Sequence, residues 1–251
     1  MTSENTLLFD LPYSTLNARD QINDIYNHTK TGSGGYVCVS NVHMLTEAHK
    51  DKSFFNVLLD ASFIVTDGMP LVWLLRSKGH KDVERIAGYD LANVLLEKSS
   101  NDGLPVLFLG STYEVLKGIE DQIKMSHPFL KVVDYISPPF RELSERENDE
   151  LINKINSRKP KIVFVSFGCP KQEVWMNKNK NKLDSLMVGI GGVFPILAGH
   201  QKRAPSWVRN MGLEWLYRLI SEPRRLWKRY LLTNTQFIII ILNKIIKRQK
   251  I

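Results

Sequence analysis

The chain has 251 residues, a length that fits one large domain or one domain with an appendage. Hydrophobic residues make up 43% and charged residues 24%, which excludes a disordered or fibrous chain. The two cysteines are too few for a disulfide framework or an ordinary zinc site, and they favour a reducing compartment. The net charge of +8 is placed unevenly. Gln201 onward holds 12 basic and two acidic residues, whereas residues 1–200 hold 22 basic and 24 acidic ones.

Short apolar runs rich in β-branched residues alternate with longer amphipathic stretches. The runs that predict strands are Tyr36–Ser40, Ser62–Thr66, Val106–Leu109, Lys131–Ile136, Ile162–Phe167 and Leu186–Ile190. The stretches that predict helices are Val42–Lys52, Tyr89–Ser99, Tyr113–Met125, Glu145–Ser157 and Gln172–Lys180. Strands that are apolar on both faces and joined by helices indicate a parallel sheet covered on both sides. We therefore expect an α/β fold with a doubly wound, mostly parallel, Rossmann-like sheet, whose ligands bind beyond the carboxyl ends of the strands.

The pattern changes after about Gly199, where predicted strands stop and Trp, Arg and Leu dominate. We expect two units, an α/β ligand-binding domain over residues 1–198 and a basic helical appendage over 199–251. The N-terminus lacks the basic segment of a secretory signal. The most apolar run of the appendage, Phe237–Leu242, is far shorter than the roughly 20 residues that a membrane-spanning helix needs. We therefore expect no membrane-spanning helix.

Small, polar or glycine-rich residues follow five of the predicted strands. These loops are Ser40-Asn41, Thr66-Asp67-Gly68, Gly110-Ser111-Thr112, Gly168-Cys169-Pro170-Lys171-Gln172 and Gly189-Ile190-Gly191-Gly192. Because the carboxyl ends of parallel strands meet at one edge of the sheet, the loops should surround one ligand.

Asp67 is the most unusual of these residues, because it ends a β-branched run and precedes a glycine. It could cap the helix that is expected to begin at Met69-Pro70. It could equally be a general base whose pKa is raised by burial. Arg85 likewise fits either a surface charge before a helix or a cation that orients this carboxylate or a phosphate. The sequence alone leaves both pairs of interpretations open.

The glycine-rich loops predict free backbone amides near a ligand. Ser111, with Glu114 three residues later, is expected to start a capping box, and a helix N-terminus is also an anion site. The run Gly189–Gly192 is not a dinucleotide-binding fingerprint, and no phosphate-binding P-loop motif occurs. An Asp-x-Asp pair, which commonly holds a divalent metal against a nucleotide diphosphate, is also missing. We expect a site without a metal.

Six stretches, taken together, resemble the WecG/TagA/CpsF family of glycosyltransferases. They are Thr66–Trp73, Arg85–Leu91, Phe167–Glu173, Gly189–Phe194, Ala204–Trp207 and Gly212–Leu219. The match runs in the right order from Asn41 to about Tyr230. The resemblance implies an inverting transferase that needs neither metal nor cofactor and moves a sugar from a UDP-sugar to a polyprenyl-diphosphate-linked sugar. Such products feed teichoic acid, common antigen, capsule or exopolysaccharide.

The resemblance also assigns residue roles. It implies that Asp67 is the catalytic base, with Asn41 and Arg85 beside it and Gln172 near the donor nucleotide. It further implies that the appendage supplies arginines to the site, namely Arg218, Arg224 and Arg225. The strand-end loops add the remaining expected substrate contacts, which are Thr66, Gly110, Ser111, Gly168, Lys171, Gly191 and Gly192.

The appendage predicts a membrane role. Beyond Tyr230, apolar residues recur at roughly helical spacing among lysines and arginines, as in helices that lie in the plane of an anionic membrane surface. The expected place of the protein is therefore the cytoplasm, peripheral on the inner face of the cell membrane. The sequence leaves open whether the chain forms a homo-oligomer, and which sugars and which polysaccharide are involved.

Two other functions compete with this interpretation. The basic appendage with its interleaved aromatic residues also fits nucleic-acid binding, against which the slightly acidic remainder of the chain argues. A nucleotide-cofactor oxidoreductase fits the expected fold, but its fingerprint glycines are missing. We therefore expect no nucleic-acid partner.

Overall fold

The protein is built around a parallel sheet of six strands in the order β4-β3-β8-β7-β5-β6. The computed structural model describes residues 5–247, apart from the side chains of Asn210 and Arg225. The strands are β3 (Gly35–Ser40), β4 (Phe63–Thr66), β5 (Val106–Gly110), β6 (Val132–Ile136), β7 (Ile162–Ser166) and β8 (Leu186–Gly189). All neighbouring pairs run parallel. The expected Rossmann-like sheet is confirmed.

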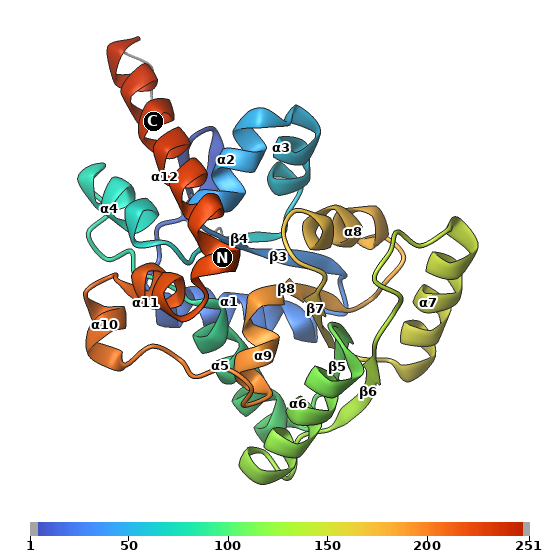
Figure 1. Ribbon diagram of the computed structural model, residues 1–251. Helices are drawn as coiled ribbons and strands as arrows, with labels where there is room; N and C mark the ends of the chain where they lie inside the picture. Colours follow the sequence, from blue (N-terminus) through green and yellow to red (C-terminus); the bar gives the residue numbers. More distant parts are fainter. Residues whose placement is uncertain (1–4, 248–251) are drawn as a thin grey trace.

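Helices cover both faces of this sheet (Figure 1). One face packs α2 (Val42–Lys50), α3 (Lys52–Leu59), α7 (Glu145–Arg158) and α8 (Lys171–Asn179). The other packs α1 (Ala18–Lys30), α5 (Gly88–Asp102), α6 (Tyr113–Ser126) and α9 (Phe194–Leu197). Successive strand residues serve opposite faces, since Cys38 joins the first core cluster and Val37 the second. This alternation explains why the strands are apolar throughout.

Several elements were not predicted from the sequence. They are α1, α3 and an antiparallel hairpin of β1 (Asn5–Leu8) and β2 (Leu11–Ser14), which packs on the first core cluster. The helix expected to begin at Met69-Pro70 is α4 (Met69–Ser77), which follows β4. The helix predicted over Val42–Lys52 ends at Lys50, because Asp51 leaves the helix and caps α3 through the amides of Ser53 and Phe54.

The capping box predicted at Ser111 is wrong. Ser111 has a left-handed backbone (φ 66°), whereas an N-cap residue needs an extended one. Thr112 is the N-cap of α6 instead, and its side chain accepts a hydrogen bond from the amide of Val115. Pro170 is the N-cap of α8.

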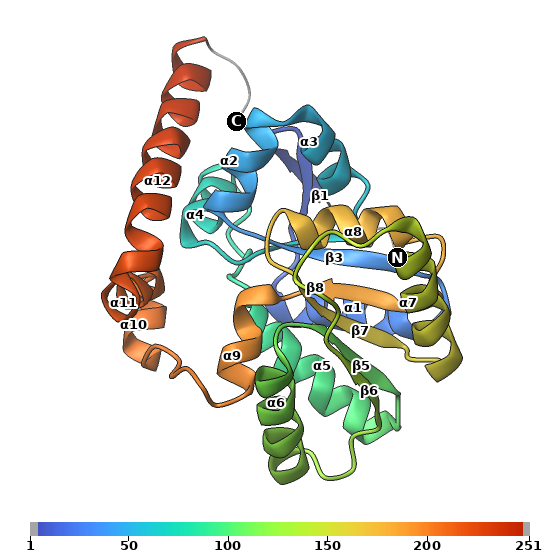
Figure 2. The ribbon, with the colours of Figure 1, turned by 45° about the vertical axis from the view of Figure 1, so that its right-hand side comes forward.

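The C-terminal segment folds back onto the body. It comprises α10 (Ser206–Asn210), α11 (Glu214–Ser221) and the long α12 (Pro223–Ile246). Before this segment, a short 3-10 turn (Gly191–Val193) joins β8 to α9. Figure 2 shows α12 standing beside α2, which it contacts. Leu226 is fully buried, and Phe237 belongs to the first core cluster and packs its ring on Phe9. No helix in residues 5–247 is long and apolar enough to cross a membrane.

Candidate active site

The ends of β3 and β4 place Asn41 and Asp67 side by side. The backbone amide of Asp67 donates to the Ser40 carbonyl at 2.8 Å, which continues the pairing of the two strands past their ends. A Cβ at Gly68 would lie 3.6 Å from Cα of Asn41, so the two loops are in close contact. The Asn41 side chain caps α2 by accepting from the Met44 amide at 3.2 Å. Asn41 thus fixes the loop beside Asp67.

The helix-cap interpretation of Asp67 is wrong, because its carboxylate does not cap α4. The N-cap of α4 is Gly68, with no side-chain cap bond. Arg85 binds Asp67 instead, with Nε donating to the Asp67 carbonyl and Nη2 donating to Oδ1 at 3.0 Å. Thr66 supports this contact, since it is buried and its hydroxyl donates to the Glu84 carbonyl next to Arg85. Arg85 is therefore a partner of Asp67 and not a surface charge.

Glu214 completes an ion network that joins the sheet to α11. Nη2 of Arg85 also donates to Glu214 Oε2 at 2.7 Å, and Arg218 Nη2 lies 3.2 Å from Glu214 Oε1. The Arg218 guanidinium also approaches Gly192, whose added Cβ would lie 3.7 Å from Nη1. The chain Asp67–Arg85–Glu214–Arg218 thus connects the ends of β4 and β8 through the C-terminal segment.

The two carboxylates that share Arg85 differ in their tendency to ionise. Burial raises the pKa of Asp67 above its ordinary value, against the opposing charges of Arg85 and Arg218. Burial also opposes ionisation of Glu214, but its hydrogen bond and charge interaction with Arg85, with help from Arg218 and Arg203, hold its pKa below the ordinary value. Environments that push two pKa values apart assign different roles to two acids. Asp67 is suited to take up a proton, and Glu214 to remain a counterion.

The glycine loops at the other strand ends approach one another closely. Gly110 has a positive φ of 105°, and a Cβ there would lie 2.5 Å from the Ser166 carbonyl oxygen, so no larger residue fits. The Ser111 amide donates to the same oxygen at 3.2 Å, and Ser137 donates its hydroxyl to the Ser111 carbonyl. Gly168 (φ 80°) is exposed at the end of β7.

Gln172 is buried, and both ends of its side-chain amide are bound within the protein. Its Oε1 accepts the Gly191 amide at 3.2 Å, and its Nε2 donates to Glu173 Oε1 at 2.7 Å. Ser166 donates its hydroxyl to the Gly191 carbonyl at 3.0 Å. The turn after β8 is thus held from both sides. Gln172 supports the turn that carries Gly191 rather than standing free in the site.

Glu173 is fully buried, and burial raises its pKa to about 7 against the opposing hydrogen bond from Gln172. The carboxyl of Glu173 has a pKa of about 7 in the folded protein and 4.5 in the unfolded chain. Its contribution to stability is therefore fully present below pH 4.5 and is lost as the pH rises from there through 7. We expect Glu173→Gln to abolish this loss, which amounts to about 2 kcal/mol between pH 5.5 and pH 8. Thermal unfolding of both proteins at pH 5.5 and pH 8 measures it. The exposed-site variant Glu114→Gln should retain the wild-type pH dependence, and an unchanged dependence in Glu173→Gln would contradict the assignment.

The remaining expected site residues lie apart from this network or outside what is described. Lys171 is exposed at the start of α8. Arg224 is exposed in the first turn of α12, and the Arg225 side chain lies outside the described residues. A cavity of about 180 Å³ between α9 and α11 is lined by Glu214 and Arg218 among others. In the described part of the chain, no three His, Cys, Asp or Glu side chains are grouped as around a metal ion.

Glu214 and Glu173 were not predicted as part of the site. Glu214 lies 129 residues from Arg85 in the sequence, and only folding brings them together. One signal could have found it, because Glu214 is one of two acids in the strongly basic C-terminal segment. Glu173 gave no comparable signal, since an acid in the first turn of a helix is ordinary.

Comparison with known proteins shows the family of the chain. The profile of the Glycosyl transferase WecG/TagA/CpsF family matches residues 6–251. The chain belongs to this family. A curated family relative from Bacillus subtilis (strain 168), an N-acetylglucosaminyldiphosphoundecaprenol N-acetyl-beta-D-mannosaminyltransferase, is 30% identical over 89% of this chain and 86% of its own length. An enzyme of the same name from Bacillus spizizenii is 32% identical over 79% of this chain and 75% of its own length.

Proposed function

We propose that this glycosyltransferase moves a sugar from a UDP-sugar to a sugar on a polyprenyl diphosphate, with inversion at the anomeric carbon and Asp67 as the base. One observation carries the proposal: Asp67 stands at the end of β4 with a raised pKa, fixed by Arg85, whose other carboxylate partner stays ionised. The names of the two Bacillus relatives support an acceptor that carries N-acetylglucosamine on diphosphoundecaprenol.

Inverting transfer is a single displacement that needs one base. The acceptor hydroxyl attacks the anomeric carbon and gives its proton to Asp67, while the bond to UDP breaks and UDP keeps the electron pair. The leaving diphosphate gains negative charge, which preorganised donors can stabilise by about 3 kcal/mol each. Arg218 beside Gly192 is suited to this task, since it lies at the end of β8 and carries the positive charge of the C-terminal segment into the site.

We assign the α/β body, residues 1–198, to donor binding and catalysis, and residues 199–251 to the approach to the membrane. The support is that α12 has two different faces. Leu226, Phe237 and Ile240 are buried against the body, whereas Leu231, Ile239, Leu242 and Ile246 are exposed. A polyprenyl-linked acceptor stays in the bilayer, so the enzyme must work at the inner membrane surface.

Titration with UDP, NAD and a short DNA duplex tests the class of ligand. Thermal stabilisation by UDP alone supports the proposal, and stabilisation by NAD or DNA instead would replace it with one of the two rival functions. A panel of UDP-sugars with a short-chain lipid-diphosphate acceptor, scored for UDP release, then identifies the donor. UDP-N-acetylmannosamine is the first to try, because both relatives are N-acetylmannosaminyltransferases.

Gln172→Ala is expected to raise the KM for the donor about fivefold with a smaller change in kcat. The reason is that the variant loses the acceptor of the Gly191 amide, a contact of about 1 kcal/mol, and so loosens the turn after β8. Steady-state kinetics over donor concentration measures it. Asn177→Ala is the matched control on the same helix, because Asn177 binds Tyr36 and Asp60 instead. An unchanged KM in Gln172→Ala would exclude this turn from donor binding.

A further inference from the structure

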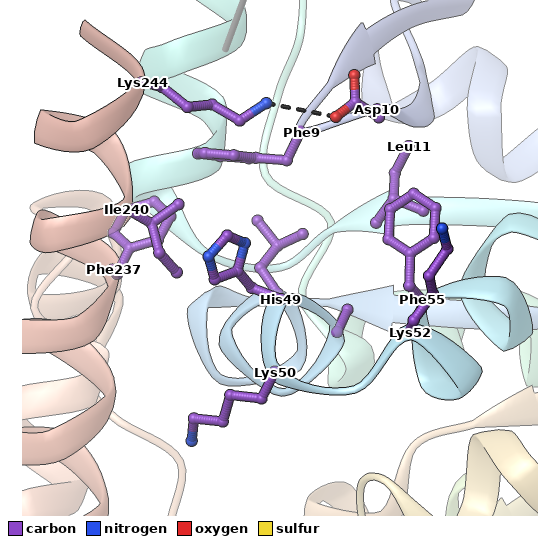
Figure 3. Close-up of a pocket in the computed structure, with 12 residues that line it drawn as sticks. Phe9, Asp10, Leu11, His49, Lys50, Lys52, Phe55, Phe237, Ile240 and Lys244 are labelled. Atoms are coloured by element: carbon purple, nitrogen blue, oxygen red, sulfur yellow. Dashed lines mark hydrogen bonds and ion pairs between the residues drawn. The ribbon is translucent and has the colours of Figure 1, made fainter. Parts of the chain in front are cut away.

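A second, larger cavity of about 580 Å³ lies away from the strand ends. It opens between the β1–β2 turn, the C-terminal end of α2, the start of α3 and the inner face of α12 (Figure 3). Asn41 caps the N-terminal end of α2, whereas the cavity is lined by later residues of this helix, from Leu45 to Lys50. The volume falls in the range of small-ligand pockets.

The walls of this cavity are apolar. They are formed by Phe9, Leu11, Leu45, Ala48, Phe55, Phe237 and Ile240. A sugar or a nucleotide placed against such walls would leave its hydroxyls and amides without hydrogen-bond partners, which is unfavourable. The part of a ligand that enters must therefore be hydrocarbon.

The polar lining is mostly cationic and contributes one carboxylate. It consists of Lys50, Lys52, Lys244, His49 and Asp10. Lys244 lies 3.3 Å from Asp10 and reaches over the Phe9 ring, and Figure 3 shows this pair next to Phe9. Glu47, which lies outside the lining, pairs with Lys50 at 2.9 Å, so among the described residues Lys52 is the lining lysine without a carboxylate partner. Its charge complements an anionic head group.

We propose that this cavity binds one hydrocarbon chain of an anionic phospholipid, with the lipid phosphate at Lys52. The wall formed by α12 supports a lipid from the membrane as the source. Phe237, Ile240 and Lys244 face the cavity, while Ile239 and Ile246 on the same helix point outward. A helix is only about 10 Å across, so a lipid beside α12 can reach into the cavity. The site does not depend on the sugar-transfer reaction.

Monomeric single-chain lipids and the full-length protein test the proposal. Calorimetric titration should show binding of lysophosphatidylglycerol below its micelle concentration. Lysophosphatidylcholine of the same chain length should bind more weakly, and glycerol phosphate, which has the head group alone, should not bind. Lys52→Glu should weaken lysophosphatidylglycerol binding by about tenfold or more, because it reverses a charge at the head group. Lys131→Glu, which makes the same charge change at an exposed site before β6, should bind as the wild type does.

A second set of variants separates the cavity from other surfaces. Phe55→Asp should abolish binding, whereas Ile239→Asn with Ile246→Asn, on the outward face of α12, should retain it. Equal binding of the two lysolipids, binding of glycerol phosphate, or equal effects of Lys52→Glu and Lys131→Glu would overturn the proposal. So would a change of oligomeric state in Phe55→Asp during sedimentation, which would assign the cavity to a second copy of the chain. If Phe55→Asp does not fold, the comparison of Lys52→Glu with Lys131→Glu still tests whether the cavity binds the lipid.

Discussion

Asp67→Asn is expected to lower turnover at least about 100-fold, the low end of the contribution of a general base. The asparagine keeps the shape of the side chain and an oxygen for Arg85 Nη2, so the fold and UDP binding should persist. What it loses is the ability to accept the proton of the acceptor hydroxyl. Single-turnover kinetics with saturating donor and acceptor measures this loss, and thermal stabilisation by UDP reports the binding that remains.

Glu214→Gln is the matched control, because Glu214 is the other carboxylate bound to Arg85. If Asp67 acts only by neutralising Arg85, the two variants should be equally impaired. If Asp67 is the base, Glu214→Gln should lose much less turnover. Near wild-type turnover in Asp67→Asn would remove this residue from the mechanism.

The pH dependence of kcat provides a separate test of the same assignment. A base must be ionised, so activity should rise with pH through the pKa of Asp67, which burial places above its ordinary value. The acidic limb of the profile should therefore lie at higher pH than an exposed aspartate would give. Glu214→Gln should keep an acidic limb but move it to lower pH, because the negative charge of Glu214 contributes to raising the pKa of Asp67. An activity that is flat down to the ordinary pKa of aspartate would contradict the assignment.

The sheet was predictable because its strands are buried on both faces and so are apolar without interruption. The N-terminal hairpin was not, for a reason visible at its turn. Phe9 and Asp10 both have positive φ, of 53° and 64°, where hairpins usually place Asn or Gly. Tertiary packing holds this turn, since the Phe9 ring packs at a tilt against Phe237 and Asp10 pairs with Lys244. A sequence pattern cannot report a turn that is stabilised from 228 or more residues away.

The candidate site, like the fold, was predictable from the sequence only in part. Asp67, Asn41 and the glycine loops were predictable, because each follows an apolar strand and the ends of parallel strands meet. The hydrogen bonds of Gln172 within the protein and the bridge through Glu214 were not, because both depend on which side chains lie nearby after folding. Position along a strand predicts which loop is in the site, but not which side chain of that loop faces the ligand.

One side of α12 is exposed along the length of the helix. Exposed positions recur every three or four residues along one side of this helix: Arg224, Lys228, Leu231, Thr235, Ile239, Leu242 and Ile246. Cations stand at the end near α11, and apolar residues follow toward the C-terminus. The opposite side, with Leu226, Thr233 and Phe237, is buried. This arrangement suits a helix that binds the body on one side and a membrane surface on the other.

Removal of the whole segment after Ala198 would be a poor test of this arrangement. It would strip Leu226 and Phe237 from the body and uncover Phe9 and Leu45, so a loss of activity could reflect damage to the fold. Substitutions confined to the outward side leave this packing intact. We therefore choose Ile239→Asn combined with Ile246→Asn, at positions that are 50% and 76% exposed.

This double variant is expected to bind anionic vesicles about 30-fold more weakly than the wild type. Each apolar side chain that leaves the acyl boundary forfeits about 1 kcal/mol or more, since these side chains are already partly covered. Turnover on a long-chain polyprenyl acceptor in vesicles should fall with the binding, whereas turnover on a short-chain soluble acceptor and stabilisation by UDP should not.

Met125→Asn with Phe129→Asn is the matched control, because these residues are also exposed and apolar but lie at the far end of α6 and just beyond it. Equal losses in the two double variants would mean that any exposed apolar residue has this effect. Unchanged vesicle binding in the α12 variant would mean that this face meets something other than the membrane.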